Sequence, residues 1–314
     1  MPSLSRRAFL TLSVAAMGTV AGCSASEPRG ALRLAAGPEG GPYETFGRRL
    51  ADEVHRTHSG LSVQVLSTAA SVQNLRLIGE GRAELGLTLA DSAADAIAGR
   101  AAFPHPVPTA AIARLYLNYL HLVVPAGSPV LTPDQLTGRT VSLGAAESGT
   151  SVMAERVLAA AGVSGIAARQ LGLPESVAAL RAGQLDAFFW SGGVPTSAIA
   201  QLAEQTAIRL VPLDAYEPVL RRAYGPVYES VSIPAGAYGR RGPTRTVGTP
   251  SYLVCATALD AGTVRAVTEV LFRRRDSLQV PDAPGSRLDE RYAVSTGTVP
   301  LHPGAAGYYR AVYG

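Results

Sequence analysis

Lysine is missing from this chain of 314 residues, since all 28 residues of its Lys and Arg count are arginines. A chain without lysine cannot build a phosphate-binding loop that ends in Gly-Lys-Ser/Thr, nor the lysine ion pair of a kinase. It also cannot form a pyridoxal Schiff base or the Ser-x-x-Lys nucleophile of penicillin-binding enzymes. These enzyme classes are therefore excluded, and we interpret the arginine usage as the mark of a GC-rich genome.

Cysteine is scarce as well, because the chain holds only Cys23 and Cys255. Cys255 lies in an apolar, strand-like run over residues 252–257, where we expect a buried small side chain rather than a nucleophile. With Cys23 modified as argued below, no internal disulfide can form. The fold must then depend on its hydrophobic core, for which an apolar content of 47% is sufficient.

Patterns typical of catalytic and metal sites are also lacking. Ser148 is not set in G-x-S-x-G, no H-E-x-x-H motif occurs, and we interpret His55 and His58 as a surface pair. The formal charge of +4 is scattered, and we interpret the basic triplet Arg273 to Arg275 as a solvated helix end rather than a nucleic-acid or lipid patch. The sequence thus predicts no catalytic residue, no metal, no cofactor and no nucleic-acid partner.

The N-terminus carries the pattern of an export signal over residues 1–22. A twin arginine precedes an apolar run over residues 9–20, which is too short to span a membrane, and small residues lead up to Cys23. This ending resembles the lipobox of bacterial lipoproteins. We therefore predict a lipidated Cys23 at the start of a short tether over residues 23–30. The remainder would be extracytoplasmic, anchored to the outer face of the cytoplasmic membrane and without access to ATP or NAD.

Strand-like and helix-like segments alternate after the tether, which predicts an α/β fold with mostly parallel sheets flanked by helices. The apolar repeat of Phe46, Leu50 and Val54 predicts a first helix, and Ser71 and Asp91 are expected to cap the next two. Two such blocks joined by long strands near 115–124 and 245–258 predict two similar lobes. We place the first lobe at 31–118 plus 246–314 and the second at 119–245.

Small hydroxyl and glycine residues recur where predicted strands lead into helices. The free N–H groups of a helix N-terminus attract a carboxylate or another anion, although each turn taken alone is better explained by ordinary capping. Parallel strands bring such turns to one edge of the sheet, so together they predict a binding cleft. The four turns concerned span residues 37–47, 68–74, 147–150 and 190–195.

Six short motifs in this order resemble the TAXI family, the extracytoplasmic solute receptors of TRAP transporters. They are Gly40-Gly41-Pro-Tyr43 with Gly47, Ser71-Val-Gln-Asn74-Leu-Arg-Leu, Gly81-Arg-Ala-Glu-Leu-Gly86 with Asp91, Ser148-Gly149-Thr150, Asp186-Ala-Phe-Phe-Trp-Ser-Gly-Gly193-Val-Pro195 and Leu301-His302-Pro-Gly-Ala305. The resemblance runs from about residue 31 to the C-terminus. It implies a two-lobed, type II-like periplasmic-binding fold whose lobes are joined by two crossing strands.

The resemblance also implies a protein without enzymatic activity that delivers glutamate, glutamine or a dicarboxylate to a TRAP-type membrane permease. The residues expected to bind the ligand are Gly41, Tyr43, Ser71, Asn74, Asp91, Ser148, Gly149, Thr150, Trp190 and Gly193. Hydroxyls and the amide would hydrogen-bond the ligand, the glycine N–H groups would bind an anion, and Trp190 would form an apolar wall. Asp91 is expected first as a helix cap and otherwise as a partner for an ammonium group.

Three alternatives stay open at this point. The same fold could serve a membrane histidine kinase as a ligand sensor or an ATP-driven importer as its solute-binding protein, and an extracytoplasmic hydrolase is the third.

The sequence departs from the family pattern at Glu44, Leu89 and Glu147. A carboxylate of Glu44 or Glu147 that pointed into the site would weaken the binding of a dianion or favour a zwitterion.

Overall fold

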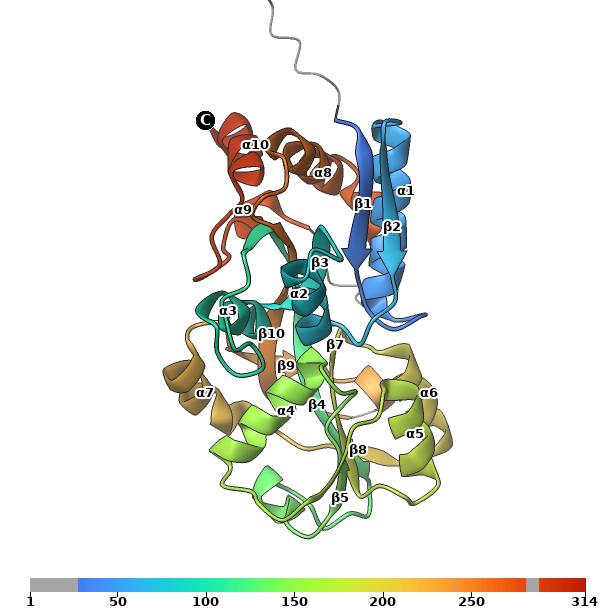
Figure 1. Ribbon diagram of the computed structural model, residues 1–314. Coiled ribbons are helices and arrows are strands. Elements are labelled where there is room, and N and C mark those ends of the chain that lie inside the picture. Colours follow the sequence, from blue (N-terminus) through green and yellow to red (C-terminus); the bar gives the residue numbers. More distant parts are fainter. Residues whose placement is uncertain (1–27, 240, 281–287) are drawn as a thin grey trace, which may run out of the picture.

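The computed structural model describes residues 28–239, 241–280 and 288–314, and it has two lobes (Figure 1). The strands β4 (Thr109–Pro125) and β10 (Thr244–Ala256) run through both of them. At ~3.3 Å per residue, the 17 residues of β4 reach about 55 Å, which is enough to connect two lobes. The two long strands expected near 115–124 and 245–258 are therefore confirmed.

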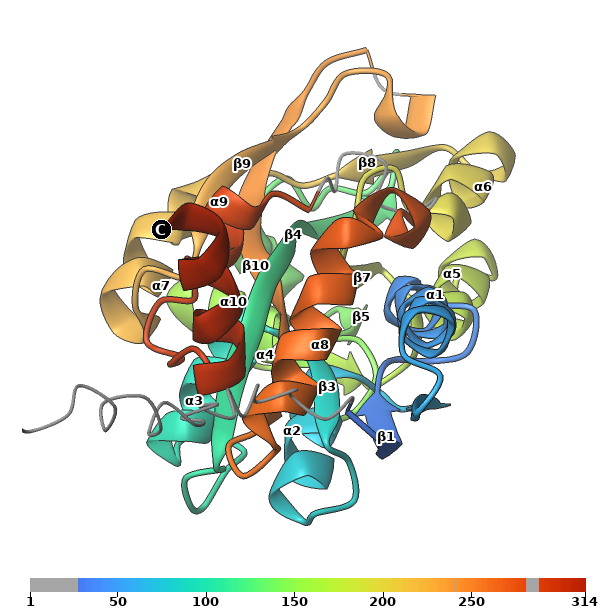
Figure 2. The same ribbon diagram turned by 90° about the horizontal axis from the view of Figure 1, so that it is seen from above.

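The upper lobe of Figure 1 contains the N-terminal third and the C-terminal end of the described chain. Its first helix begins at Pro42, where the missing N–H of proline costs no helical bond, and buries the predicted stripe of Phe46, Leu50 and Val54. Figure 2 shows α8 and α10 crossing the top of this lobe side by side. Its elements are β1 (Gly30–Ala35), α1 (Pro42–Thr57), β2 (Leu61–Leu66), α2 (Ser71–Gly79), β3 (Leu85–Leu89), α3 (Ala90–Ala98), α8 (Ala261–Arg273), α9 (Glu290–Ala293) and α10 (Pro303–Tyr313).

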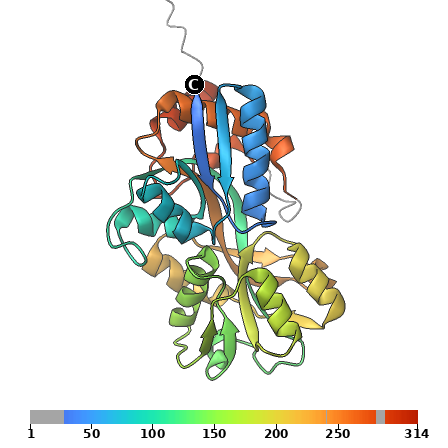
Figure 3. The same ribbon diagram turned by 45° about the vertical axis from the view of Figure 1, so that its right-hand side comes forward.

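The lower lobe repeats the alternation of strand and helix, as Figure 3 shows from another side. Its elements are β5 (Thr140–Ser142), α4 (Gly149–Ala160), β6 (Ala167–Arg169), α5 (Leu173–Arg181), β7 (Ala187–Gly192), α6 (Ser197–Gln205), β8 (Ile208–Leu210), α7 (Glu217–Tyr224) and β9 (Glu229–Ile233). Short 3-10 turns occur at Pro133–Leu136, Asp214–Tyr216, Ala237–Gly239 and Arg275–Leu278.

The strands of both lobes form one continuous mixed sheet in the order β2-β1-β3-β10-β4-β7-β5-β6. Strand β1 pairs in parallel with β2 and β3, and β5 pairs in parallel with β6 and β7. The crossing strands β4 and β10 pair antiparallel with their neighbours and with each other. The predicted division at residues 118 and 246 falls within these two strands, and those boundaries stay a prediction.

Two expected helix caps are wrong. Helix α2 begins one residue after Ala70, and Ser71 is its first helical residue. Helix α3 begins at Ala90 after the N-cap Leu89, so Asp91 lies inside its first turn. In both cases the backbone of the preceding residue occupies the N-cap position. The Ser71 hydroxyl accepts from Leu89 of β3. The Asp91 carboxylate bonds to Arg156 and Tyr228 of the other lobe as well as to the N–H of Ser92.

Cys255 is fully buried and free, as expected, and burial raises the pKa of its thiol to about 12. The signal over residues 1–22 and the lipidation site Cys23 lie outside the described residues. No helix in the described part of the chain is both long enough and apolar enough to cross a bilayer.

Candidate functional site

A cavity of about 660 Å³ lies between the two lobes and takes its lining from both. The upper lobe contributes the turn before α1, residues 69–71 and Leu89. The lower lobe contributes the starts of α4 and α5 and the end of β7. This volume lies in the range of small-molecule sites, and a position between two lobes is a common one for them.

Seven of the ten residues expected to bind a ligand line this cavity. They are Gly41, Tyr43, Ser71, Ser148, Gly149, Thr150 and Trp190. Four different strand-to-helix turns are thus brought together, because the parallel strands of each lobe end at the edge that faces the other lobe.

Asn74 does not line the cavity, although the sequence predicts it as a ligand contact. It is fully buried, and its amide Nδ2 donates to the carbonyls of Ala36 and Leu87, each at 2.6 Å. Its Oδ1 accepts from the Thr68 hydroxyl at 2.5 Å. This amide therefore ties α2 to the middle of β3 and to the residue that follows β1, so both of its polar atoms bond within the fold and not to a solute.

Asp91 and Gly193 also lie outside the cavity lining. The Asp91 carboxylate is buried among the Tyr228 hydroxyl, the Ser92 N–H and the Arg156 guanidinium. Gly193 uses its carbonyl to accept a bond from the Thr196 hydroxyl, and the preceding Gly192 lines the cavity instead.

Two of the residues that depart from the family pattern, Glu44 and Glu147, are acidic, but neither places a charge in the cavity. Glu44 is buried and its carboxylate pairs with Arg48 one helical turn away. Glu147 lies at a positive φ of 59°, and its half-exposed carboxylate pairs with Arg76 of the upper lobe. Neither residue lines the cavity, so the expected repulsion of an anion does not arise from them.

The lobes meet closely at the start of α4. The Glu147 carbonyl accepts from the N–H groups of Val72 and Gln73, at 3.1 and 3.3 Å, and so caps α2 from the other lobe. A Cβ on Gly149 would come within 2.5 Å of Ser71 Oγ and 2.6 Å of Leu89 Cδ1. Only glycine permits this approach, so the structure has its lobes in contact beside the cavity.

Tyr43 lines the cavity and belongs to a small polar group that the sequence did not predict. Its hydroxyl lies 2.7 Å from Ser251 Oγ, which also accepts from Asn118 Nδ2 at 2.5 Å. Burial raises the pKa of the Tyr43 hydroxyl well above its usual range, so it stays protonated. Because Asn118 and Ser251 belong to β4 and β10, the crossing strands themselves hold this cavity residue.

The comparison with protein families covers almost all of the described chain. The family model described as NMT1-like matches residues 34–312. The chain belongs to the NMT1-like family.

Solved structures similar to this NMT1-like protein share its fold at low identity. One from Bordetella bronchiseptica RB50 has a TM-score of 0.54 and 17% identity, and the match covers 90% of this chain and 89% of that one. A binding component of an ABC phosphonate transporter from Pseudomonas aeruginosa has 0.53 and 8%, over 78% and 75%. XAC2383 from Xanthomonas citri, bound to ATP, has 0.52 and 15%, over 90% and 98%. The likeness confirms the two-lobed fold of periplasmic binding proteins.

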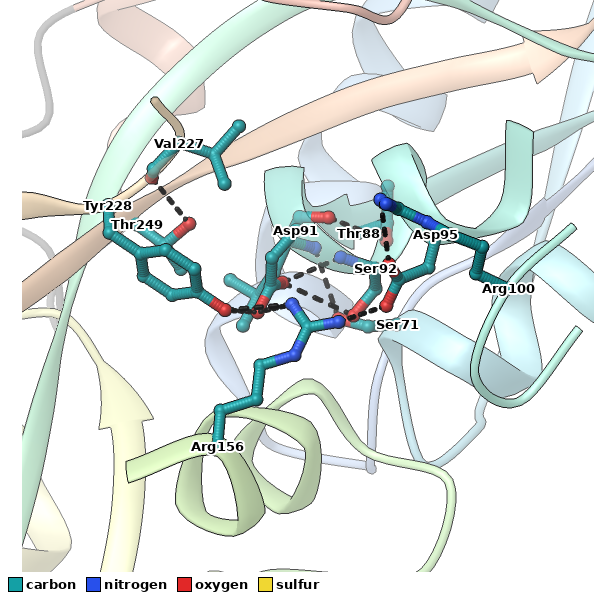
Figure 4. Close-up of polar contacts among 11 residues, drawn as sticks. Ser71, Thr88, Asp91, Ser92, Asp95, Arg100, Arg156, Val227, Tyr228 and Thr249 are labelled. Atoms are coloured by element: carbon teal, nitrogen blue, oxygen red, sulfur yellow. Dashed lines mark hydrogen bonds and ion pairs between the residues drawn. The ribbon is translucent and has the colours of Figure 1, made fainter. Parts of the chain in front are cut away.

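A second contact between the lobes of this NMT1-like protein is a buried group of charges, shown in Figure 4. Arg156 of α4 pairs with Asp91 at 3.4 Å and with Asp95, both on α3, and donates to the Tyr228 hydroxyl at 2.8 Å. Tyr228 in turn donates to Asp91 at 2.7 Å. Burial raises the pKa of Asp91 above its usual value, although the guanidinium and the tyrosine hydroxyl act to lower it.

Neighbouring residues complete this charged group. The Arg156 side chain is 7% exposed, and its guanidinium carbon lies 3.9 Å from the centre of the Tyr224 ring. Asp95 also pairs with Arg100 at 3.3 Å, so two carboxylates face two guanidiniums. The Thr249 hydroxyl of β10 donates to the Val227 carbonyl at 3.0 Å, which holds the Tyr228 segment in place.

Sequence reasoning missed the turn over residues 170–175, Asn118 and Arg156. The turn was detectable, because Gly172-Leu-Pro-Glu places a glycine and a proline where a helix opens. Asp91 and Asp95 are four residues apart and so share one helix face, which indicates a common cation. No local pattern indicates which of the 28 arginines that cation is.

Proposed function

We propose that this protein is an extracytoplasmic solute receptor that captures a small organic anion or amino acid between its lobes. The observation that carries the proposal is the cavity lined by both lobes, with uncapped helix starts and hydroxyls at its surface. Hinge motion about β4 and β10 would admit the solute, and binding to both lobes would favour the closed arrangement. No covalent step is required of any residue in this scheme.

We propose a TRAP-type permease as the receiving partner and a lipid at Cys23 as the anchor. The TAXI resemblance of six motifs supports the first part, and the lipobox-like ending of the export signal supports the second. An ATP-driven importer is the second candidate, because one structural relative is named as a component of an ABC phosphonate transporter. Uptake into vesicles energised either by an ion gradient or by ATP separates the two. Loss of lipid labelling in Cys23→Ser tests the anchor.

The receptor function itself is tested by thermal unfolding of the purified protein with amino acids, 2-oxo acids and dicarboxylates. A solute at 1,000 times its Kd adds about 4 kcal/mol to the free energy of unfolding. For a chain of this size the midpoint should rise by several degrees, at roughly 2 °C per kcal/mol. No rise with any compound, after bound solute has been removed by unfolding and refolding, would contradict a receptor for these classes.

The site is tested by the double variant Ser148→Ala/Thr150→Val. Both side chains line the cavity, so we expect the variant to fold and to lose most of its affinity. Ser164→Ala is the control, since Ser164 is exposed outside the cavity and should leave the affinity unchanged. Equal affinities in the two variants would reject this site.

A further inference from the structure

We propose that the solute carries one anionic group, held by uncharged donors alone, on an apolar body, and that the cavity discriminates against dianions. This inference rests on the proposed receptor function and specifies the solute of the same cavity. The sequence predicts dicarboxylates among the possible solutes, and this inference excludes them. Three features of the cavity carry it: the direction of its hydrogen bonds, the charges in its lining and its apolar walls.

Three buried hydroxyls at the cavity already accept a hydrogen bond from the backbone. Ser71 Oγ accepts from the N–H of Leu89 at 3.1 Å, and Ser148 Oγ accepts from the N–H of Ser151 at 3.1 Å. Thr150 Oγ1 accepts from the N–H of Ser191 at 3.2 Å. Within the described residues none of the three hydroxyls donates a bond of its own. Each therefore has an O–H group left to donate to a solute, although the side chains are only 1–7% exposed.

Helix starts add further donors around the same space. Gly41 and Gly172 are the N-caps of α1 and α5, and neither has a side chain that could bond the first N–H groups of its helix. The start of α4 at Gly149 lies between the hydroxyls of Ser71 and Ser148. Each helix start carries about half a positive charge, so the polar part of this cavity attracts a negative group that accepts hydrogen bonds.

The charged side chains of the lining are only acidic. No arginine or histidine occurs among the described residues that line the cavity, and the chain has no lysine. The only ionisable carboxylates in the lining are Glu39 and Glu175, both exposed. One carboxylate of a solute can be bound by the hydroxyls and helix starts, whereas a second would meet no cation and would be repelled by these two acids.

Large apolar side chains form much of the remaining lining, and the cavity is too large for a short polar solute alone. Side chains of Leu89, Leu171, Leu173, Phe189 and Trp190 surround a cavity of about 660 Å³. An apolar body on the solute would gain from leaving water against these side chains. The geometry therefore points to a monocarboxylate with an aryl or branched alkyl group, a class that includes the apolar amino acids.

Trp190 is the only tryptophan of the chain, and its fluorescence reports directly on the cavity. We would titrate the refolded protein with 3-phenylpropanoate and L-leucine, and with the dianions benzylmalonate and glutarate. We expect saturable binding of the monocarboxylates, with dianions at least tenfold weaker. Tighter binding of a dianion would overturn this inference while supporting the receptor. No fluorescence change with either class would instead overturn the receptor function on which it rests.

Variants sharpen the same titration. Thr150→Val removes a donor and should weaken the monocarboxylate about tenfold, whereas Thr150→Ser keeps the hydroxyl and the affinity. Glu175→Gln removes a repelling carboxylate, so it should improve dianion binding and leave the monocarboxylate unchanged. Glu204→Gln is the control, because Glu204 is exposed outside the lining. Equal affinities of Thr150→Val and Thr150→Ser would overturn the role of the hydroxyl donor.

Discussion

The two contacts between the lobes differ in their chemistry. At the cavity side, the start of α4 approaches α2 with backbone groups, hydroxyls and a glycine. We call this the uncharged contact because its one ion pair, Glu147 with Arg76, is about 40% exposed and its buried part holds no charge. At the α3 side, two carboxylates, two guanidiniums and a tyrosine hydroxyl form a group that is largely buried. The difference indicates that the two contacts have different roles. The charged contact fixes how the lobes meet, and the uncharged contact leaves the polar groups of the cavity free to bind a solute.

The largest expected effect comes from breaking the charged contact. Arg156→Met keeps the length of the side chain but leaves the buried Asp91 without its cation. Removing one partner of a buried ion pair lowers the free energy of unfolding by about 3–5 kcal/mol, which urea denaturation measures. Arg273→Met is the control, since Arg273 is 72% exposed in a helical pair with Glu269 and should cost under about 1 kcal/mol. Similar losses of the free energy of unfolding in both variants would show that the buried contact matters no more to stability than an exposed ion pair.

The next effect concerns His121, a buried residue behind the cavity wall whose ring we expect to be uncharged. His121 pairs across the sheet with Trp190, is fully buried, and contacts the Tyr238 hydroxyl through Nε2 at 3.0 Å. Burial lowers the pKa of His121 from 6.5 to about 4, so the ring stays neutral at pH 7.

The sign of the pH dependence follows from this lowered pKa. The unfolded chain takes up the proton near pH 6.5 and the folded chain only near pH 4, so stability is lost as the pH falls between these values. The loss reaches roughly 3 kcal/mol. His121→Gln should lack this part of the acid sensitivity, whereas the exposed His105→Gln should keep it. Urea denaturation at pH 7 and at pH 4.5 gives the loss of the free energy of unfolding for each variant. Equal losses in the two variants would contradict this prediction.

A smaller effect is expected from enlarging the uncharged contact. The Cβ of Gly149→Ala would overlap Ser71 and Leu89 of the other lobe, so the lobes could not meet as they do now. Overpacking of this kind costs about 1–3 kcal/mol, which should appear as a roughly tenfold or greater loss of solute affinity in calorimetry. Gly127→Ala meets nothing within 4 Å and should bind normally. Normal binding by Gly149→Ala would show that closure does not use this contact.

The smallest effect is expected at Glu147. Its positive φ strains a residue with a Cβ, whereas its ion pair with Arg76 is about 40% exposed on both sides. Glu147→Gly relieves the strain, worth about 1 kcal/mol, and loses a pair worth less than that. We therefore expect the midpoint of thermal unfolding to stay equal or to rise slightly. Glu155→Gly is the control, because Glu155 lies in the middle of α4 on the same lobe and a glycine there should lower the midpoint. A clear loss in Glu147→Gly would show that the pair matters more than the strain.

Much of this protein follows from local sequence. The stripe of Phe46, Leu50 and Val54 predicts α1, and the strand-to-helix turns predict which loops border the cavity. Ser148 caps α4 by accepting from the Ser151 N–H, as expected from a serine at a helix start. Such features depend on neighbours within a few residues, so the sequence indicates them without knowledge of the fold.

Other roles could be decided only by contacts between distant segments. Asn74, Asp91 and Glu147 have the residue types of a binding site, yet each is used by a partner far along the chain. Asp91 meets Arg156 and Tyr228, which lie 65 and 137 residues away. The α/β alternation, the crossing strands and the turns at the cavity can therefore be predicted from local patterns of residues. Which polar side chains face the cavity depends on the folded arrangement, because a buried polar group must bond to whatever the folded chain places beside it.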